Sequence, residues 1–336
     1  MDRPKSRLMW LRNPNVVRLL QGLATGSIPL THDGLHQQTP WRTVTHLRDL
    51  LMDSGVLPRV DRQLILYQRW LTERLAIIEE PEHRDALTIV GAQAVYLRTQ
   101  DTTIRSAAYT ADGDISIDPE RLGDEPLIEQ AMRGAGVTLR NRESGLWERQ
   151  QQVGNRTVPV EVDLLVPHQL APRPNTKRRT ELPPHDEWAT KKVPGLEVAA
   201  VDRSVLTVGS LTPGDTRRID AYVADPAALL VAKAIKLNER IRDADKRPDR
   251  LNNKDAGDVY RIMTTVPADE VAQIFAQLQD DPRVGDVARQ GLGLLRTLFG
   301  AAATPGTNLA VQALAGDVPE TRIRALAPAF VAILNQ

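Results

Sequence analysis

Hydrophobic and polar positions follow different patterns in successive parts of the chain. In the first 80 residues, the apolar residues recur at helical spacing, which predicts helices over 41–54 and 59–79. Pro81 ends the second helix, because a proline disfavours helical backbone in the residue before it. In the middle of the chain the spacing becomes that of strands, and in the last third it returns to that of helices.

The strand-rich part begins at Leu87. Its first strand is followed by Gly91 and a short helix, and two later runs joined through Gly154-Asn155 are typical of an antiparallel hairpin. A strand, a helix, another strand and a hairpin in this order favour a mixed sheet with helices packed on it. The predicted strands are 87–90, one or two within 104–117, 146–153, 158–166, 196–208 and 218–223, and the predicted helices are 92–97 and 126–133.

The pattern after Asp225 is almost wholly helical. Asp225 is suited to the N-cap of the first of these helices, with Pro226 at its first position. Before this point, prolines and charged residues crowd residues 171–195, which are therefore expected to form a linker. The helices predicted after Asp225 are 227–242, 252–263, 268–279, 284–299 and 320–334.

Together these patterns predict an α+β fold in three parts. A helical N-terminal segment (1–84) precedes a domain with a mixed β-sheet (85–224), and a helical C-terminal domain (225–336) follows. The 336 residues suit such a division, since a domain usually holds about 100–200 residues.

Composition narrows the classes of function. The chain has 43 Lys and Arg and 43 Asp and Glu, so any contact with nucleic acid or acidic lipid must come from a local patch. The absence of cysteine excludes disulfides, thiolate metal sites and thiol catalysis. We find no signal peptide and no apolar run of membrane-spanning length, so a cytoplasmic protein without a membrane partner is expected. The motifs of a hydrolase nucleophile elbow and of a P-loop are both absent.

Three aspartates are candidates for a metal site. In Asp112-Gly-Asp114 both carboxylates point to the same side of a strand, because side chains alternate along it. Asp163 lies within the strongly β-forming run 160–166, where an unpaired charge would be costly to bury. Carboxylate oxygens gathered on neighbouring strands suit Mg²⁺. The alternatives are a turn at Asp112-Gly-Asp114 and a structural salt bridge at Asp163.

Lysines near the end of the strand-rich part are candidates to contact phosphate. On the helix expected from residue 227, Lys233, Lys236 and Arg240 form a basic stripe beside the apolar stripe, and Lys233 lies closer to the apolar side. The alternative is a solvated helix face. Asp255 and Asp258 share a face of the next helix, where they either support the lysine or pair with Lys254 or Arg261.

The order of these pieces resembles the polymerase-β-like nucleotidyltransferases. The pieces are a glycine after a strand, Asp-x-Asp, a later aspartate between hydrophobic residues, and a lysine-rich helix. The stretch Lys233-Ala-Ile-Lys-Leu-Asn-Glu-Arg240, followed by Lys254-Asp255-Ala-Gly-Asp258, is similar to the AbiEii-type group. That group contains abortive-infection and type IV toxin–antitoxin toxins. The resemblance covers residues 87–265, and it implies a nucleotidyltransferase-type mixed sheet.

The resemblance also implies roles for single residues. Asp112 and Asp114 would hold Mg²⁺ or Mn²⁺ bridging the triphosphate. Asp163 matches the third acidic position, which completes the metal site or helps to activate the attacking hydroxyl. Lys233 would neutralise phosphate charge, and Asp255 would orient this lysine or the base.

Nucleotide binding is implied for four positions. Gly91 allows the backbone to approach a phosphate closely, and the following helix offers free N–H groups from Ala92 onwards. Lys233 and Lys236 would add positive charge. The chain departs from the family pattern here, because the family has Gly-Gly or Gly-Ser where this chain has Gly91-Ala92. The change removes a hydroxyl contact to phosphate and leaves the backbone donors in place.

The implied reaction transfers a nucleoside monophosphate from an NTP to a hydroxyl. The toxin group implies RNA as acceptor, such as the 3′ end of tRNA, and an antitoxin protein as partner. A protein or small-molecule acceptor stays open, as does a non-catalytic nucleic-acid- or protein-binding protein with a degenerate transferase fold. Basic residues at 177–179 and 191–192 either contact a polynucleotide or belong to a solvated loop. The N-terminal helices are similar to a helical stretch of integrase-like recombinases, which implies a docking module.

Overall fold

The computed structural model describes residues 81–99, 104, 112–140, 143–153, 156–172, 179–209, 216–248, 251 and 253–334. All of them belong to one compact unit, Val60–Gln336. The helices predicted over 41–54 and 59–79, and the stretch similar to integrase-like proteins, lie outside the described residues. The domain boundaries at 84 and 224 stay predictions.

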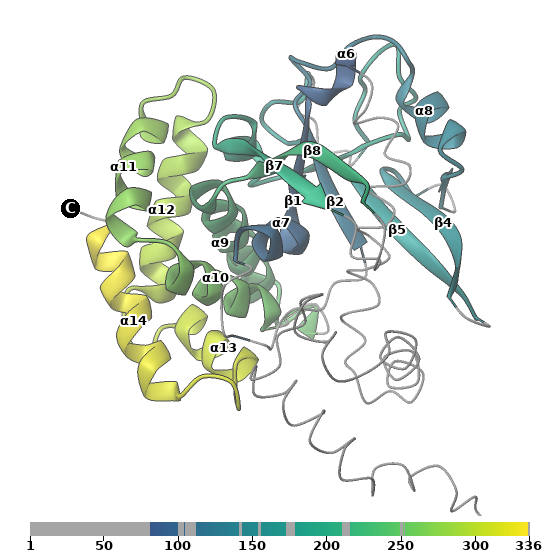
Figure 1. The fold of residues 1–336 in the computed structure, drawn as a ribbon. Coiled ribbons are helices and arrows are strands. Elements are labelled where there is room, and N and C mark those ends of the chain that lie inside the picture. The colour runs from purple at the N-terminus through teal and green to yellow at the C-terminus, as the bar shows by residue number, and fades with distance from the viewer. Residues whose placement is uncertain are drawn as a thin grey trace, which may run out of the picture. The chain divides into compact units, whose positions relative to one another are not determined.

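The described strands form one eight-stranded mixed sheet (Figure 1). Its order is β3-β4-β5-β2-β1-β8-β7, and β6 pairs with β5 beside this path. β1 is antiparallel to β2 and parallel to β8, while β5 is parallel to β2 and antiparallel to β4. The α+β fold with a mixed sheet is therefore confirmed. The strands are β1 Leu87–Val90, β2 Asp112–Ile117, β3 Thr138–Leu139, β4 Leu146–Val153, β5 Arg156–Pro167, β6 Lys191–Val193, β7 Arg203–Gly209 and β8 Arg218–Ala224.

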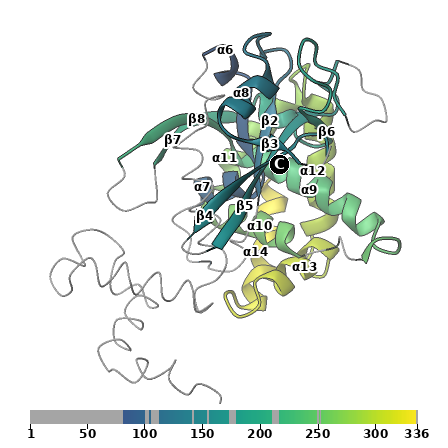
Figure 2. The same ribbon diagram turned by 90° about the vertical axis from the view of Figure 1, so that its right-hand side faces the viewer.

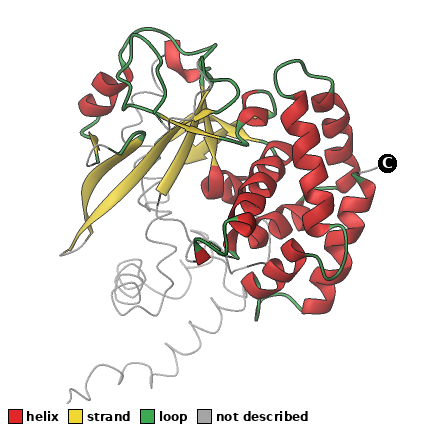
Figure 3. Ribbon diagram, turned by 180° about the vertical axis from the view of Figure 1, so that it is seen from behind, coloured by secondary structure: helices red, strands yellow, loops and turns green. Residues whose placement is uncertain are grey.

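Most of the described helices follow the sheet in the chain. Figure 1 shows the helices from α9 to α14 gathered beside the sheet, and Figure 3 shows the same arrangement from behind. None of the described helices is both long and apolar enough to span a bilayer. The helices are α6 Pro81–Arg84, α7 Gly91–Arg98, α8 Ile128–Gly134, the 3-10 helix η3 Glu197–Ala200, α9 Pro226–Arg242, α10 Lys254–Thr265, α11 Ala268–Gln279, α12 Gly285–Phe299, α13 Pro305–Ala313 and α14 Glu320–Ile333.

The two central strands of the sheet have one buried face and one more open face. On β5, which Figure 2 shows running beside β4, Val162 and Leu164 are fully buried, while Glu161 and Asp163 between and beside them are only partly buried. On β2, Ile115 is likewise fully buried. Alternation along the strands thus sends the apolar residues into the core and leaves the carboxylates on the opposite face.

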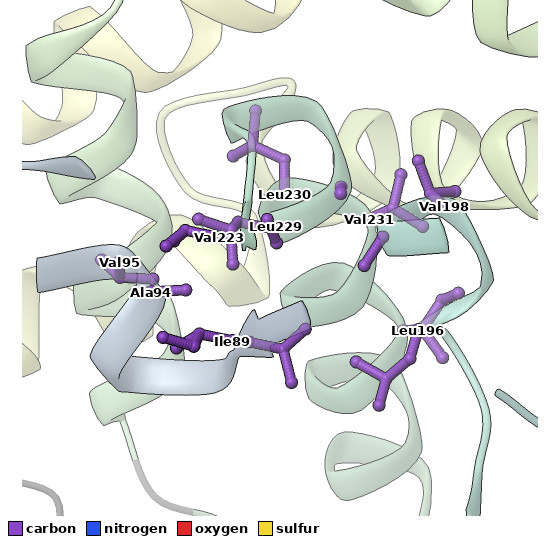
Figure 4. Close-up of a cluster of buried hydrophobic side chains, with 14 of the residues drawn as sticks. Ile89, Ala94, Val95, Leu196, Val198, Val223, Leu229, Leu230 and Val231 are labelled. Atoms are coloured by element: carbon purple, nitrogen blue, oxygen red, sulfur yellow. The ribbon is translucent and has the colours of Figure 1, made fainter. Parts of the chain in front are cut away.

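The core joins the sheet to the first long helix. Figure 4 shows Ile89 of β1 and Val223 of β8 close to side chains of α7 and α9. Leu230 of α9 is fully buried in this cluster, and Ala94 of α7 is fully buried as well. Because α7 is only eight residues long, this packing holds the helix where β1 ends.

The stretch expected to be a linker is in part built into the sheet. β6 pairs parallel with β5, and Ala189 and Thr190 just before β6 are buried. The carbonyl of Ala189 accepts a hydrogen bond from the Trp147 indole N–H at 2.9 Å, and the carbonyl of Trp188 accepts one from the Gly145 amide at 2.8 Å. Composition alone misses this, because these bonds come from residues far away in the sequence.

Helix α9 begins where the sequence predicts, but the residue predicted to cap it does not form the capping bond. Asp225 holds the N-cap position with Pro226 next, yet its side chain makes no capping bond. The Asp225 carboxylate pairs with Arg98 at 2.9 Å instead. The Ala228 amide donates to the carboxylate of Asp202 at 2.7 Å, so a residue 24 positions away from Pro226 caps the helix.

This cap makes stability depend on pH. Burial raises the pKa of Asp202 to about 6, although the Ala228 amide lowers it in part. The folded chain therefore holds a proton that the unfolded chain releases, so this group stabilises the fold at low pH and the effect disappears as pH rises through 6. Relative to Asp202→Asn, the wild type should lose on the order of 2 kcal/mol of unfolding free energy between about pH 4 and 7. Urea unfolding at several pH values measures the difference, and a difference that stays constant over this range would contradict the assignment.

Candidate active site

The pairing of β2 with β5 brings the predicted carboxylates to one face of the sheet. The strands run parallel with Asp114 opposite Asp163 and Asp112 opposite Glu161. Paired residues on neighbouring strands, about 4.8 Å apart, share a face, and so do residues two apart on one strand. Asp112, Asp114 and Asp163 therefore occupy register positions on the same face. The alternative of an isolated turn at Asp112-Gly-Asp114 is wrong, because these residues begin β2.

Gly91 lies directly against one of these carboxylates. It is the first residue of α7, with a φ of +68°, and Val90 before it pairs with Asp114 across β1 and β2. A Cβ atom at position 91 would come within 1.9 Å of the Asp114 Oδ2 atom. Only a glycine combines this backbone conformation with room for the carboxylate.

Replacing Gly91 should therefore lower the unfolding free energy by more than its positive φ alone would. We expect Gly91→Ala to lower the unfolding free energy by about 1–3 kcal/mol from the positive φ, and by a further amount because Asp114 must move. Gly136→Ala is the matched control, since Gly136 has a φ of +75° and nothing within 4 Å of the added atom. Urea unfolding of both variants compares them, and equal losses would show that the close approach to Asp114 does not matter.

Asp163 forms an ion pair with a lysine that was not predicted as its partner from the sequence. The Lys191 ammonium donates to the Asp163 Oδ1 atom at 2.6 Å, and the side chains are 23% and 14% exposed respectively. The salt bridge considered as an alternative for Asp163 is thus present. Lys191 belongs to β6, in register with Leu165 of β5, so it lies on the same face as Asp163.

The same face carries two further carboxylates with their own cation. Glu148 of β4 is in register with Glu161 of β5. Arg140 forms ion pairs with both, directly to Glu161 and at 3.7 Å to Glu148. We call this face, with Asp112, Asp114, Glu148, Glu161 and Asp163, the acidic face.

The donor chemistry of the acidic face fits a hard divalent ion. Carboxylate oxygens are the ligands that Mg²⁺ and Mn²⁺ prefer, and Asp112 and Asp114 would hold such an ion. Among the side chains that the structure describes, no three His, Cys, Asp or Glu residues form a metal-binding group. The side chain of Asp112 is not among them. The metal-ligand assignment of Asp112, Asp114 and Asp163 stays a prediction.

A second group of charges is buried between α9 and α10. The Lys233 ammonium donates to Asp255 at 2.7 Å and to Asp258 at 2.6 Å, and the three side chains are 5%, 4% and 0% exposed. Burial on its own would lower the pKa of Lys233, but the two carboxylates hold that pKa above its usual value. Burial would likewise raise the pKa of Asp255, and Lys233 instead holds it below its usual value. We call Lys233, Asp255 and Asp258 the lysine cluster.

The structure therefore places Lys233 against Asp255, as predicted, but its ammonium is enclosed by two carboxylates. Lys236 and Arg240, the other cations of the predicted basic stripe, lie at the edge of the lysine cluster. Arg240 pairs with Asp255 at 2.5 Å, and the Lys236 ammonium lies 3.7 Å from it. The Lys236 side chain is 49% exposed, so of the two predicted nucleotide-binding lysines Lys236 is the one open to solvent.

Helix α7 extends from the acidic face to the lysine cluster. Its first residue, Gly91, touches Asp114, and Tyr96 lies five residues later, about 7.5 Å along the helix axis. The Arg261 guanidinium stands 5.5 Å from the centre of the Tyr96 ring. Burial raises the pKa of Tyr96, and the charge of Asp258 in the cluster raises it further.

Sequence reasoning missed Lys191 and Tyr96 as parts of these groups. A weak signal existed for Lys191, since Lys191-Lys192-Val193 is a short run without proline or glycine inside the stretch taken as a linker. No sequence signal pointed to Tyr96, because its neighbours come from helices far along the chain.

Comparison with known proteins adds no relative. No protein-family model matches the chain, no curated protein matches it, and no solved structure matches it. The likeness to the AbiEii-type nucleotidyltransferases thus rests on the residues and motifs themselves.

Proposed function

We propose that this chain is a Mg²⁺-dependent nucleotidyltransferase of the AbiEii-like kind. The observation that carries the proposal is the register of Asp114 with Asp163, with Asp112 two residues before Asp114 on the same strand face. The contact between Gly91 and Asp114 supports it, because it sets the start of α7 beside the carboxylates. Phosphates approach such glycine-led helix starts readily.

In the proposed reaction an NTP donates its nucleoside monophosphate to a hydroxyl. The hydroxyl oxygen forms a bond to the α-phosphorus, the bond from that phosphorus to the bridging oxygen breaks, and pyrophosphate leaves. The divalent ion supplies charge neutralisation at the triphosphate. Asp112 and Asp114 would hold that ion, and Asp163 would complete the site or accept the proton of the hydroxyl. The Gly91 backbone and the amide of Ala92 contact phosphate.

In this proposal the two lysines have different roles. Lys236, half exposed, contacts phosphate. Lys233, bonded to Asp255 and Asp258, holds α9 against α10 and so fixes the helix on which Lys236 stands. We assign Asp255 a supporting role, because its carboxylate accepts a hydrogen bond from the Lys233 ammonium and lies 3.7 Å from that of Lys236.

The acceptor in this proposal is RNA, with the 3′ end of tRNA as the first candidate. The support is the likeness of the lysine helix and of Lys254-Asp255-Ala-Gly-Asp258 to the toxin group. Action as the toxin of a toxin–antitoxin pair, with an antitoxin protein as partner, belongs to the same proposal.

A transfer assay tests the proposal. The full chain is incubated with each of four α-labelled NTPs, Mg²⁺ and total RNA, and RNA is separated from free nucleotide. We expect labelled RNA with at least one NTP, and none with Asp112→Ala or with chelator present. If wild type and variant are equally inert while both shift a nucleic acid duplex, the chain is a binding protein with a degenerate transferase fold.

Two observations favour that second candidate. Asp163 already holds a lysine, and Ala92 stands where the family has glycine or serine, so two groups expected to serve the nucleotide are altered. The chelator arm separates the two functions, because binding of a duplex by a degenerate fold needs no divalent ion.

A further inference from the structure

We propose that His185 is a pH-sensitive switch: its neutral imidazole holds the start of α8 in place, and its protonation releases that helix start. The residues concerned are the 123–127 segment, which leads from β2 into α8, and the first residue of α8 itself. None of them belongs to the acidic face or to the lysine cluster. The inference therefore does not depend on the proposed function.

Both ring nitrogens of His185 bond to the backbone of this region. The Ile128 amide donates to the Nδ1 atom at 3.2 Å, and the Nε2 atom lies 3.0 Å from the Gly123 carbonyl oxygen. A nitrogen that accepts a hydrogen bond carries no proton, so the ring proton lies on Nε2 and is donated to the carbonyl. The ring is therefore neutral, and it joins the two ends of the 123–127 segment.

The start of α8 depends on the bond to Nδ1. α8 has only seven residues, and its N-cap residue, Leu127, supplies no side-chain bond. The imidazole nitrogen is thus the acceptor for the first amide of the helix, in the role that a capping side chain usually has. Ile128 and Met132 of this helix are buried, so an opened α8 exposes apolar surface to water.

A second histidine holds the middle of the 123–127 segment. The His83 Nε2 atom donates to the Pro126 carbonyl at 2.6 Å, and His83 is fully buried. The ring centres of His83 and His185 lie 6.1 Å apart in an edge-to-face arrangement. Two imidazoles from distant parts of the chain thus bind this short connection, and the His185 ring bonds to both of its ends.

Protonation of His185 removes the bond to the helix. The added proton goes to Nδ1, the one ring nitrogen that has a free electron pair. Two N–H groups then face each other, and the buried Ile128 amide loses its acceptor, which carries a free-energy penalty. The bond from Nε2 to the Gly123 carbonyl survives protonation, so the release is at the helix start.

The groups around His185 set the direction of the pH effect. Burial lowers its pKa below the usual 6.5, and the Gly123 carbonyl raises it in part. Beyond these, His83 of α6 lowers it, whereas the carboxylates of Glu129 in α8 and of Asp124 raise it. The folded chain thus binds a proton less readily than the opened chain, so the closed state is favoured above pH 6.5 and loses stability as pH falls below it.

Hydrogen exchange measured by mass spectrometry tests the inference. The full chain is exchanged at several pH values between about 7.5 and 5.5, and the rates are corrected for the intrinsic effect of pH. We expect the opening equilibrium of α8 to rise by up to about tenfold over this range. Helix α12, which contains no histidine, is the reference within the same chain and should not change.

Two variants show whether His185 causes the change. His185→Asn keeps an acceptor and a donor but does not titrate, so we expect opening of α8 that no longer depends on pH. His168→Asn is the matched control, since it removes a different, partly exposed histidine and should retain the pH dependence. His185→Gln replaces His185→Asn if thermal unfolding shows that the latter is not folded.

Three results would overturn the inference. They are a wild-type α8 whose protection is constant with pH, a pH dependence that persists without His185, and one that disappears in His168→Asn. Nucleotide transfer is not measured in this experiment, so its outcome leaves the transferase proposal to the transfer assay.

Discussion

Asp114→Asn should lower the rate of nucleotide transfer by about 10³-fold or more, the largest effect that we expect from a single change. The substitution keeps the shape of the side chain and removes its charge. A ligand of a catalytic ion contributes several kcal/mol of transition-state stabilisation, and each 1.4 kcal/mol is about tenfold in rate. Asp114 also lies closest to Gly91, where the proposed phosphate contact begins. Initial rates with saturating NTP and Mg²⁺ measure the loss.

A matched control separates this effect from general damage to the sheet. Asp220→Asn makes the same change on β8, at an exposed residue that bonds only to Thr207 among the hydrogen bonds seen at its side chain. We expect Asp220→Asn to keep the wild-type rate and both variants to unfold at similar urea concentrations. Full activity in Asp114→Asn would show that Asp114 is not a ligand of the catalytic ion.

Lys233→Met should lower the unfolding free energy by about 3–5 kcal/mol, because it leaves two buried carboxylates without their shared cation. Folded domains are stable by only about 5–15 kcal/mol, so this one change removes a large fraction. The loss falls mainly on Asp258, which is fully buried, whereas Asp255 keeps Arg240 at 2.5 Å. Urea unfolding gives the value.

Two further variants test the cause of that loss. Lys236→Met, one turn away on α9, should cost less than about 1 kcal/mol, because its side chain is half exposed and its carboxylate distance is 3.7 Å. Adding Asp258→Asn to Lys233→Met should restore part of the stability by removing the uncompensated charge. If the double variant were less stable than Lys233→Met, the buried charge would not be the source of the loss.

The alternation within single strands could be read from the sequence, and with it much of the candidate site. Val162 and Leu164 flank Asp163, so the sequence places the carboxylate on the other face from the core. Which strands pair with one another, and in which register, could not be predicted from the alternation. Asp114 faces Asp163 only because β2 and β5 lie side by side in register, and that pairing depends on contacts between residues 49 positions apart.

Features held by distant contacts were the ones missed. α13 has few large apolar residues to give a stripe, and it packs against α10, which lies three helices earlier in the chain. The cap of α9 comes from Asp202 and the partner of Asp163 from Lys191, each supplied by another segment. Local pattern carries no information on such pairs.

The shortness of α7 has a consequence for how the chain responds to a ligand. A helix of eight residues does not persist alone in water, so its order depends on the buried packing of Ala94 and Val95 and on what its two ends touch. One end adjoins a carboxylate of the acidic face, and at the other end Arg98 pairs with Asp225 and donates hydrogen bonds to the carbonyls of β8. A ligand that holds the Gly91 end in place should therefore also favour the ordered helix at its Arg98 end, so we expect binding at the acidic face to reduce the local unfolding of α7.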